Sequence, residues 1–169
     1  LQNSYEQTRK RGFYKHIIRD IANIRHCHVH SPVRAFRKSE FPDLLFQDIA
    51  LDGLIRVLNN PFYVPEHIKP GTLSDWYSVI DWWFNEYGQI AKAVKINSQE
   101  ISFIGEKLLQ DHLFWYCVEK ATEYGLPVKM HTGQWAMNNV MNMHWVNDNP
   151  SDCALLCKQA PNTRFIFFH

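Results

Sequence analysis

Apolar and polar positions are most regular in the second half of the chain, where three similar units follow one another. The first unit begins with Thr72 and Asp75, which are N-capping residues just before the strongly apolar run 76–84. Gly88 follows this run in the position that a left-handed residue commonly takes after a helix. The pattern therefore predicts a helix between residues 72 and 88.

The second and third units repeat this arrangement. Residues 108–124 predict a helix that Gly125 ends, because four of its side chains fall on one stripe. These side chains are Leu109, Leu113, Tyr116 and Cys117. Ser151 is the expected N-cap of a third helix, and Pro161 is expected to end that helix.

A short apolar run follows each predicted helix and is typical of a buried strand. The three runs span residues 90–96, 127–131 and 164–169. Three helix–turn–strand units in a row predict an α/β fold with parallel strands and crossover helices. We expect the strands to end at Lys95, His131 and His169, whose separations of 36 and 38 residues fit a (β/α)8 TIM-type barrel. An open doubly wound sheet is the alternative.

The first half of the chain is less regular. A basic run at residues 9–11 is typical of a solvated helix end. Residues 23–30 alternate as a strand does and stop at a Ser-Pro pair. Residues 42–46 and 54–58 predict either a strand or the start of a helix.

The composition is that of one globular domain. The 169 residues carry 18 Lys and Arg against 17 Asp and Glu, a formal net charge of +1, which excludes a basic nucleic-acid platform. Hydrophobic residues make up 46% and charged residues 21%, and no apolar run is long enough for a transmembrane helix. The four cysteines form no CxxC pair, so we expect reduced thiols in a cytoplasmic protein.

Polar side chains stand at the predicted strand ends. In parallel α/β folds, functional residues gather at the carboxyl ends of the strands. His131 and His169 would therefore project into one barrel mouth, close enough to share a metal ion. Lys95 would lie beside them, and the long polar loop after His131 is typical of an active site. These residues also have purely structural interpretations. The two histidines could be held by ordinary hydrogen bonds, Lys95 could bury only its aliphatic stem, and Asn138 and Asn139 could form a turn.

A second cluster comprises His26, His28 and His30, which are alternate residues of the predicted strand. An HxH pair on a strand is a metal-binding geometry because its two side chains share one face. Histidines followed by Ser31 and Pro32 also resemble the histidine-triad nucleotide hydrolases, but the sequence shows no glycine-flanked phosphate loop. A histidine-rich strand with ordinary hydrogen bonds is the third interpretation.

Residues 113–133 resemble the amidohydrolase superfamily, in the branch that includes uronate isomerase-like and decarboxylase-like members. This block ends in His131, Thr132 and Gly133 and is the specific part of the likeness. Weaker matches lie at residues 93–96, 138–139, 149–152 and 161–169. The likeness is strongest over residues 75–169.

The resemblance implies a metal-dependent (β/α)8 barrel in which His131 ends the fifth strand and His169 the sixth. Both histidines would serve the metal centre, His169 also as an acid–base residue, and we expect the cofactor to be a divalent ion, Zn²⁺. Lys95 matches the fourth-strand position that carries a carboxylated lysine in some members, and here we expect it to contact substrate. The other expected substrate-binding residues are Gln134, Asn138 and Asn139.

The function that this resemblance implies is a metal-dependent hydrolase that attacks a small-molecule substrate with a metal-activated water. Isomerase or decarboxylase activity on the same barrel, or a catalytically silent barrel, are the alternatives. His26 and His28 fall too late for the family's first-strand HxH pair, and no eighth-strand Asp follows His169. We therefore expect residues 1–169 to be one domain that lacks both ends of the barrel and is inactive alone. It should bind neither nucleic acid nor membrane, and a homo-oligomer stays open.

Overall fold

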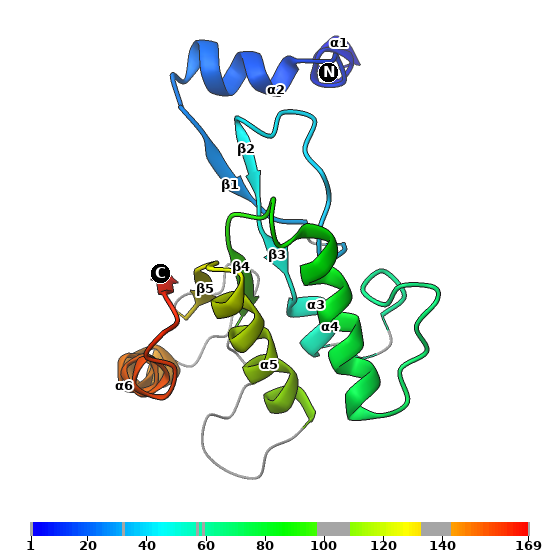
Figure 1. Cartoon of the computed structure of the whole chain (residues 1–169). Helices are drawn as coiled ribbons and strands as arrows, with labels where there is room; N and C mark the ends of the chain where they lie inside the picture. The colour runs from blue at the N-terminus through cyan, green and yellow to red at the C-terminus, as the bar shows by residue number, and fades with distance from the viewer. Residues whose placement is uncertain are drawn as a thin grey trace.

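The computed structural model describes residues 2–31, 33–56, 58, 60–97, 109–132 and 143–168 (Figure 1). Its helices are α1 (Gln2–Thr8), α2 (Phe13–Lys15), the π-helix η1 (His16–Ile21), α3 (Asp52–Arg56), α4 (Leu73–Tyr87), α5 (Leu109–Glu123) and α6 (Met143–Gln159). Its strands are β1 (Cys27–Val29), β2 (Leu45–Gln47), β3 (Ile49–Ala50), β4 (Val94–Asn97), β5 (Val128–His131) and β6 (Phe165–Phe168). From β3 onward helices alternate with strands, which confirms the α/β prediction.

All paired strands run parallel, in two groups that meet at Asp48. β1 pairs with β2, and β3, β4, β5 and β6 lie side by side in chain order. The Asp48 N–H donates to the Val29 carbonyl at 3.0 Å, and the next N–H, of Ile49, donates to the Ala93 carbonyl at 2.9 Å. The segment 45–50 therefore lies between β1 and β4. A doubly wound sheet reverses its strand order at a switch point, whereas the described strands follow one another as barrel strands do.

One face of the sheet packs on α4 and α5 and forms the hydrophobic core (Figure 1). Four strand side chains on this face are 0% exposed: Val94, Ile96, Val128 and Met130. Helix α4 adds a stripe of buried residues three and four positions apart: Trp76, Val79, Ile80, Trp83 and Phe84. Because strand side chains alternate between faces, the polar residues of β4 and β5 are left on the opposite face.

A capping box fixes the amino end of α4. The Thr72 hydroxyl accepts a hydrogen bond from the Asp75 N–H at 3.3 Å, and Asp75 Oδ2 accepts one from the Thr72 N–H at 2.8 Å. The hydrogen bond from the Gly71 N–H, followed by those from Thr72, lowers the pKa of Asp75. The predicted N-terminus of this helix is therefore confirmed.

Replacing Thr72 by alanine should lower the free energy of unfolding by about 1 kcal/mol, because one N–H of the first turn loses its acceptor. Urea denaturation followed by circular dichroism measures this loss. Thr72→Ser keeps the hydroxyl and should unfold close to the wild-type midpoint. An equal loss in both variants would contradict the capping role.

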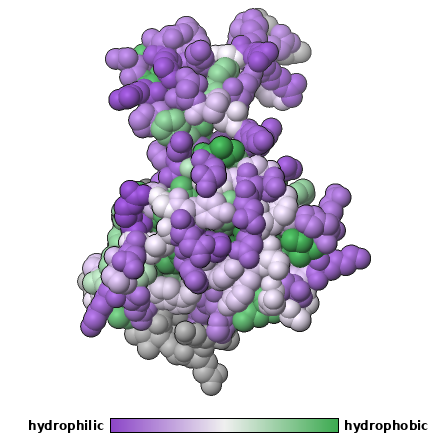
Figure 2. All heavy atoms as spheres, viewed as in Figure 1, coloured by the Kyte–Doolittle hydropathy of each residue, from purple (hydrophilic) through white to green (hydrophobic). Residues whose placement is uncertain are grey.

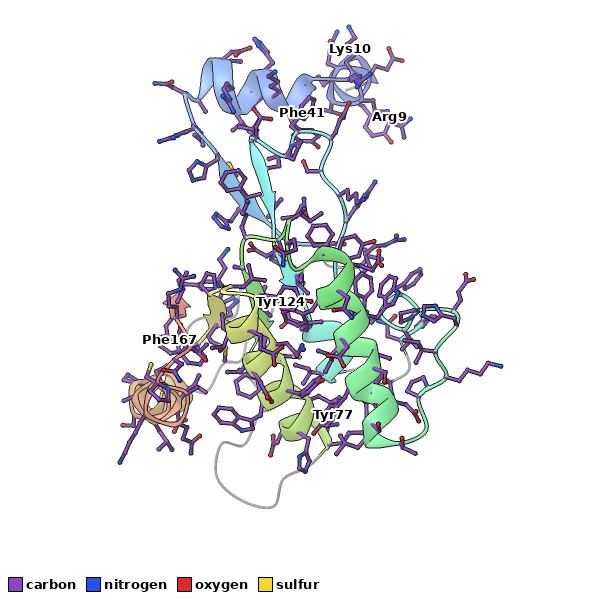
Figure 3. The ribbon with its side chains drawn as sticks, viewed as in Figure 1. Arg9, Lys10, Phe41, Tyr77, Tyr124 and Phe167 are labelled. Carbon is purple, nitrogen blue, oxygen red and sulfur yellow. The ribbon has the colours of Figure 1, made fainter. Side chains whose placement is uncertain are left out.

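Gly88 ends α4 in a way that the sequence pattern does not predict. Its φ is −58°, so it is not left-handed. Close packing requires glycine instead, because a Cβ at this position would lie 2.3 Å from Tyr124 Cδ1. Tyr124 lies between α5 and α4 (Figure 3), and its hydroxyl donates to Asn85 Oδ1 at 2.8 Å. Gly125, in contrast, has a φ of +66° and ends α5 as predicted.

Helix α6 is longer than predicted. It begins at Met143, so Ser151 lies inside the helix and is not its N-cap. The helix runs through Pro150, whose missing N–H removes one helical hydrogen bond without ending the helix here. It stops at Gln159, two residues before Pro161, which agrees with the predicted end.

Helices α1 and α2 and the π-helix η1 lie at one end of the molecule, apart from the core (Figure 1). Neither α2 nor η1 has a buried residue. The basic run 9–11 is exposed, as predicted, and Arg11 Nε contacts Glu40 Oε1 at 2.6 Å. Figure 2 shows a mainly hydrophilic surface here, and Figure 3 shows Arg9 and Lys10 projecting from it. Within the described ranges, no helix has the length and apolar character needed to cross a membrane.

Candidate functional site in the barrel interior

Strands β4 and β5 carry the same polar pattern. Their register pairs Lys95 with Lys129 and Asn97 with His131. Lys95, Lys129 and His131 share the face opposite the helix-covered core, which is the interior of a barrel. The strand end predicted at Lys95 is wrong, because β4 stays paired with β5 as far as Asn97. Lys95 therefore lies two residues deeper along the strands than His131.

Phe168 of β6 brings Lys95 and His131 into one cluster. It is the register partner of His131, and the two rings stack with centroids 5.0 Å apart and planes at 28°. The Lys95 ammonium lies 5.2 Å from the centroid of the same ring. A cation over an aromatic face gains electrostatic energy, more so where water is excluded. Two of the predicted site residues are thus neighbours in the structure.

Lys95 is the most deeply buried cation of this cluster. It is 4% exposed, and its Nζ lies 4.0 Å from Asp52 Oδ2. Burial lowers the pKa of Lys95, Asp52 opposes this effect, and nearby Lys129 adds to it. The Lys95 ammonium has therefore lost much of its hydration, and it lies near the Asp52 carboxylate and the Phe168 ring.

Asp48 joins three strands through its side chain. It is 1% exposed, and its two carboxylate oxygens have different partners. Oδ1 lies 3.1 Å from His28 Nδ1, and Oδ2 accepts a hydrogen bond from Lys129 Nζ at 2.6 Å. Because β4 separates segment 45–50 from β5, the Lys129 side chain crosses the interior face to reach Asp48. A buried carboxylate with a hydrogen-bonding partner at each oxygen is a rigid element of the site.

His30 belongs to the same electrostatic cluster. Loss of hydration lowers its pKa, Lys95 lowers it further, and Asp52 and Asp48 oppose the change. The cluster therefore extends from the carboxyl end of β1 to β5. It contains three imidazoles, two carboxylates and two ammonium groups: His28, His30, His131, Asp48, Asp52, Lys95 and Lys129.

The residues that the structure describes do not complete a metal site. Among them, no three histidine, cysteine, aspartate or glutamate side chains come together in a way that could hold an ion. Asp48 already has a protein partner at each oxygen, and the His131 ring stacks on Phe168. His169 lies outside the described residues, so the predicted pair of zinc ligands, His131 and His169, stays a prediction.

Three other predicted site residues also lie outside the described ranges: Gln134, Asn138 and Asn139. The predicted active-site loop is shorter than expected at its far end, because residues 143–145 already belong to α6. His26 and His28 do share a face, with ring centroids 6.3 Å apart. The hydrogen bond of His28 to Asp48 agrees with the interpretation of this strand as one held by ordinary hydrogen bonds.

Asp48, Asp52 and Lys129 were not predicted as site residues from the sequence. A signal for Lys129 was present, since it alternates with His131 in the way that Lys95 alternates with Asn97. Gln47 and Asp48 interrupt the otherwise apolar segment 44–51, and a buried acid in such a segment needs a partner. The partner itself lies 81 residues away along the chain and follows only from the fold.

The fold is part of a (β/α)8 barrel. Its strands are parallel and follow chain order, helices cover one face, and the opposite face is polar. Uronate isomerase from Bacillus halodurans C-125, a TIM barrel of the amidohydrolase superfamily, has a similar structure, with a TM-score of 0.65 and 13% sequence identity. The match covers 98% of this chain and 43% of that enzyme. It confirms the expected fold. No family model and no curated protein matches the sequence.

Lys95→Met should stabilise the protein most at neutral pH, and the advantage should shrink as the pH approaches 10.5. The folded-state pKa of Lys95 lies below its ordinary value of 10.5, so between these two values the unfolded chain binds more protons. The free energy of unfolding of the wild type therefore rises with pH in that window. Methionine does not titrate, so the variant lacks this rise. Urea midpoints from pH 7 to 10.5 measure it. Exposed Lys158→Met is the matched control and should show no such trend.

Proposed function

We propose that this chain forms part of the active site of a small-molecule enzyme of the amidohydrolase superfamily, and that the reaction is isomerisation of a sugar acid. One observation carries the proposal. The cluster of imidazoles, carboxylates and ammonium groups lies on the interior strand face of a fold similar to uronate isomerase over 98% of the chain. In barrel enzymes this face, at the carboxyl ends of the strands, is where chemistry takes place.

A sugar acid is an anion that carries several hydroxyl groups, and the cluster suits such a ligand. Lys95 and Lys129 supply positive charge, and His131 supplies a hydrogen-bonding ring at the carboxyl end of β5. Interconversion of an aldose and a ketose moves one proton between neighbouring carbons and needs no oxidant. It requires a base that faces the substrate, together with polar groups that hold the oxygens.

A metal-dependent hydrolase is the second candidate. It is favoured by the position of His131, since its strand ends where the superfamily resemblance places a metal ligand. Here His131 and His169 would hold a divalent ion, Zn²⁺ by expectation, which would activate water for attack on a small substrate. The residues that would complete such a site are not among those described, so no step is assigned to it.

Activity assays on the gene product that contains this chain distinguish the isomerase from the hydrolase. Purified protein is incubated with hexuronates, and the ketose product is followed by NMR; a panel of amides and lactones is tested in parallel. The proposal expects isomerisation that falls at least tenfold in His131→Asn and survives in Lys158→Met, a lysine on the exposed surface of α6. Hydrolysis without isomerisation would support the second candidate. Inactivity in both assays would support a catalytically silent barrel.

A further inference from the structure

We propose that His28 is the general base of this site and that Asp48 is the positioning residue that fixes its tautomer. The inference rests on the proposed isomerisation for its chemical meaning. Its structural part is a dyad between neighbouring strands, in which Asp48 Oδ1 lies 3.1 Å from His28 Nδ1. The sequence suggested metal binding or a histidine-triad site for His28, and it gave no role to Asp48.

The tautomer follows from the hydrogen bond. A carboxylate can only accept, so Nδ1 of His28 must carry the proton that lies between the two groups. In a neutral imidazole the lone pair is then on Nε2. Among the described residues, none forms a hydrogen bond to Nε2, so this nitrogen is available to a ligand.

Asp48 is held too firmly to turn away. Its N–H is anchored on Val29 of β1, and its second oxygen accepts the hydrogen bond from Lys129 at 2.6 Å. With the backbone and Oδ2 both fixed, Oδ1 keeps its direction toward His28. This is the arrangement by which an enzyme orients an imidazole before substrate arrives.

His28 is an exposed member of the cluster, as is His30. The His28 side chain is 38% exposed, against 1% for Asp48 and 5% for Lys95. The rings of Phe46 and His28 meet edge to face with their centroids 5.6 Å apart, and this contact limits rotation of the imidazole. A base must reach the substrate. Among His28, Asp48 and Lys129, the His28 side chain is the most exposed.

The step conserves atoms and electrons. Nε2 takes the proton from the carbon next to the carbonyl, the C–H electron pair forms a carbon–carbon double bond, and the carbonyl oxygen takes a proton from solvent. The imidazolium then returns its proton to the former carbonyl carbon, while the neighbouring hydroxyl loses its proton to solvent and becomes the new carbonyl. The substrate class is an α-hydroxy aldehyde or its ketose isomer.

The tautomer can be tested on the 169-residue chain without any substrate. Two-bond ¹H–¹⁵N correlation spectra of the labelled chain should show His28 with a protonated Nδ1 and a lone pair on Nε2. Asp48→Asn should shift His28 toward the Nε2-protonated form. Asp20→Asn removes the matched carboxylate, 3.0 Å from exposed His16, and should leave His28 unchanged. Unchanged amide spectra show that the variants fold. A wild-type His28 protonated on Nε2 overturns the proposal.

The catalytic role is tested in the complete gene product. His28→Gln should lower kcat for hexuronate isomerisation by about 10²–10⁴-fold with KM changed only a few-fold, and added imidazole should restore part of the rate. His16→Gln, at an exposed histidine of η1 outside this cluster, should stay within about threefold. Turnover that survives His28→Gln refutes the base while leaving the proposed function intact. A wild-type enzyme without turnover refutes the proposed function itself. If added Zn²⁺ selectively shifts the ¹⁵N signal of His28 Nε2, then His28 is a metal ligand and the assignment as base is wrong.

Discussion

Asp48→Ala should lower the free energy of unfolding by about 3–5 kcal/mol, because it leaves a buried ion pair with one partner missing. Asp48 is 1% exposed and contacts both Lys129, at 2.6 Å, and His28, at 3.1 Å. Without the carboxylate, the Lys129 ammonium keeps its cost of desolvation and loses its counter-charge. Urea unfolding at pH 7 measures the difference.

Two companion variants separate this effect from the loss of any carboxylate. Asp43→Ala breaks an exposed ion pair with Arg19, in which Asp43 is 68% exposed, and should cost less than about 1 kcal/mol. In the double variant Asp48→Ala/Lys129→Met the stranded charge is gone, so part of the lost stability should return. Additive losses would mean that Asp48 and Lys129 do not stabilise each other.

The helices and most strands of the second half follow from local chemistry. Helix α5 is specified by its apolar stripe and by Gly125, and β5 by the run that follows that glycine. Both signals depend only on neighbours in the chain, so the sequence is enough to predict them. The parallel, barrel-type arrangement follows from the repetition of such units, and the structure confirms it.

The errors occur where distant residues decide the local structure. Gly88 is a glycine because Tyr124, 36 residues away, fills the space where a side chain would stand. The register with β5 carries β4 on to Asn97, so Lys95 is not terminal. Pro150 favours a helix that starts after it, yet α6 begins at Met143 and runs through this proline.

The candidate site shows the same division. His131 was placed correctly at a strand end, since one strand predicts its own end from its own residues. The dyad of His28 with Asp48, and the reach of Lys129 across the sheet, connect residues 20 and 81 positions apart. No periodicity contains that information, because it depends on which strands become neighbours.

Phe84→Ala should cost about 3–5 kcal/mol, since removing a fully buried phenyl ring loses its transfer free energy and leaves a cavity. Phe84 is 0% exposed on the inner stripe of α4, and its ring centroid lies 5.5 Å from that of Tyr124, the residue that follows α5. The cavity cannot collapse easily, because Gly88 and Tyr124 are already in contact beside it. Phe62→Ala makes the same chemical change at a site that is 55% exposed and should cost less than about 1 kcal/mol. Chemical unfolding of both variants measures the contrast, and similar losses would show that the stripe of α4 is not the centre of the core.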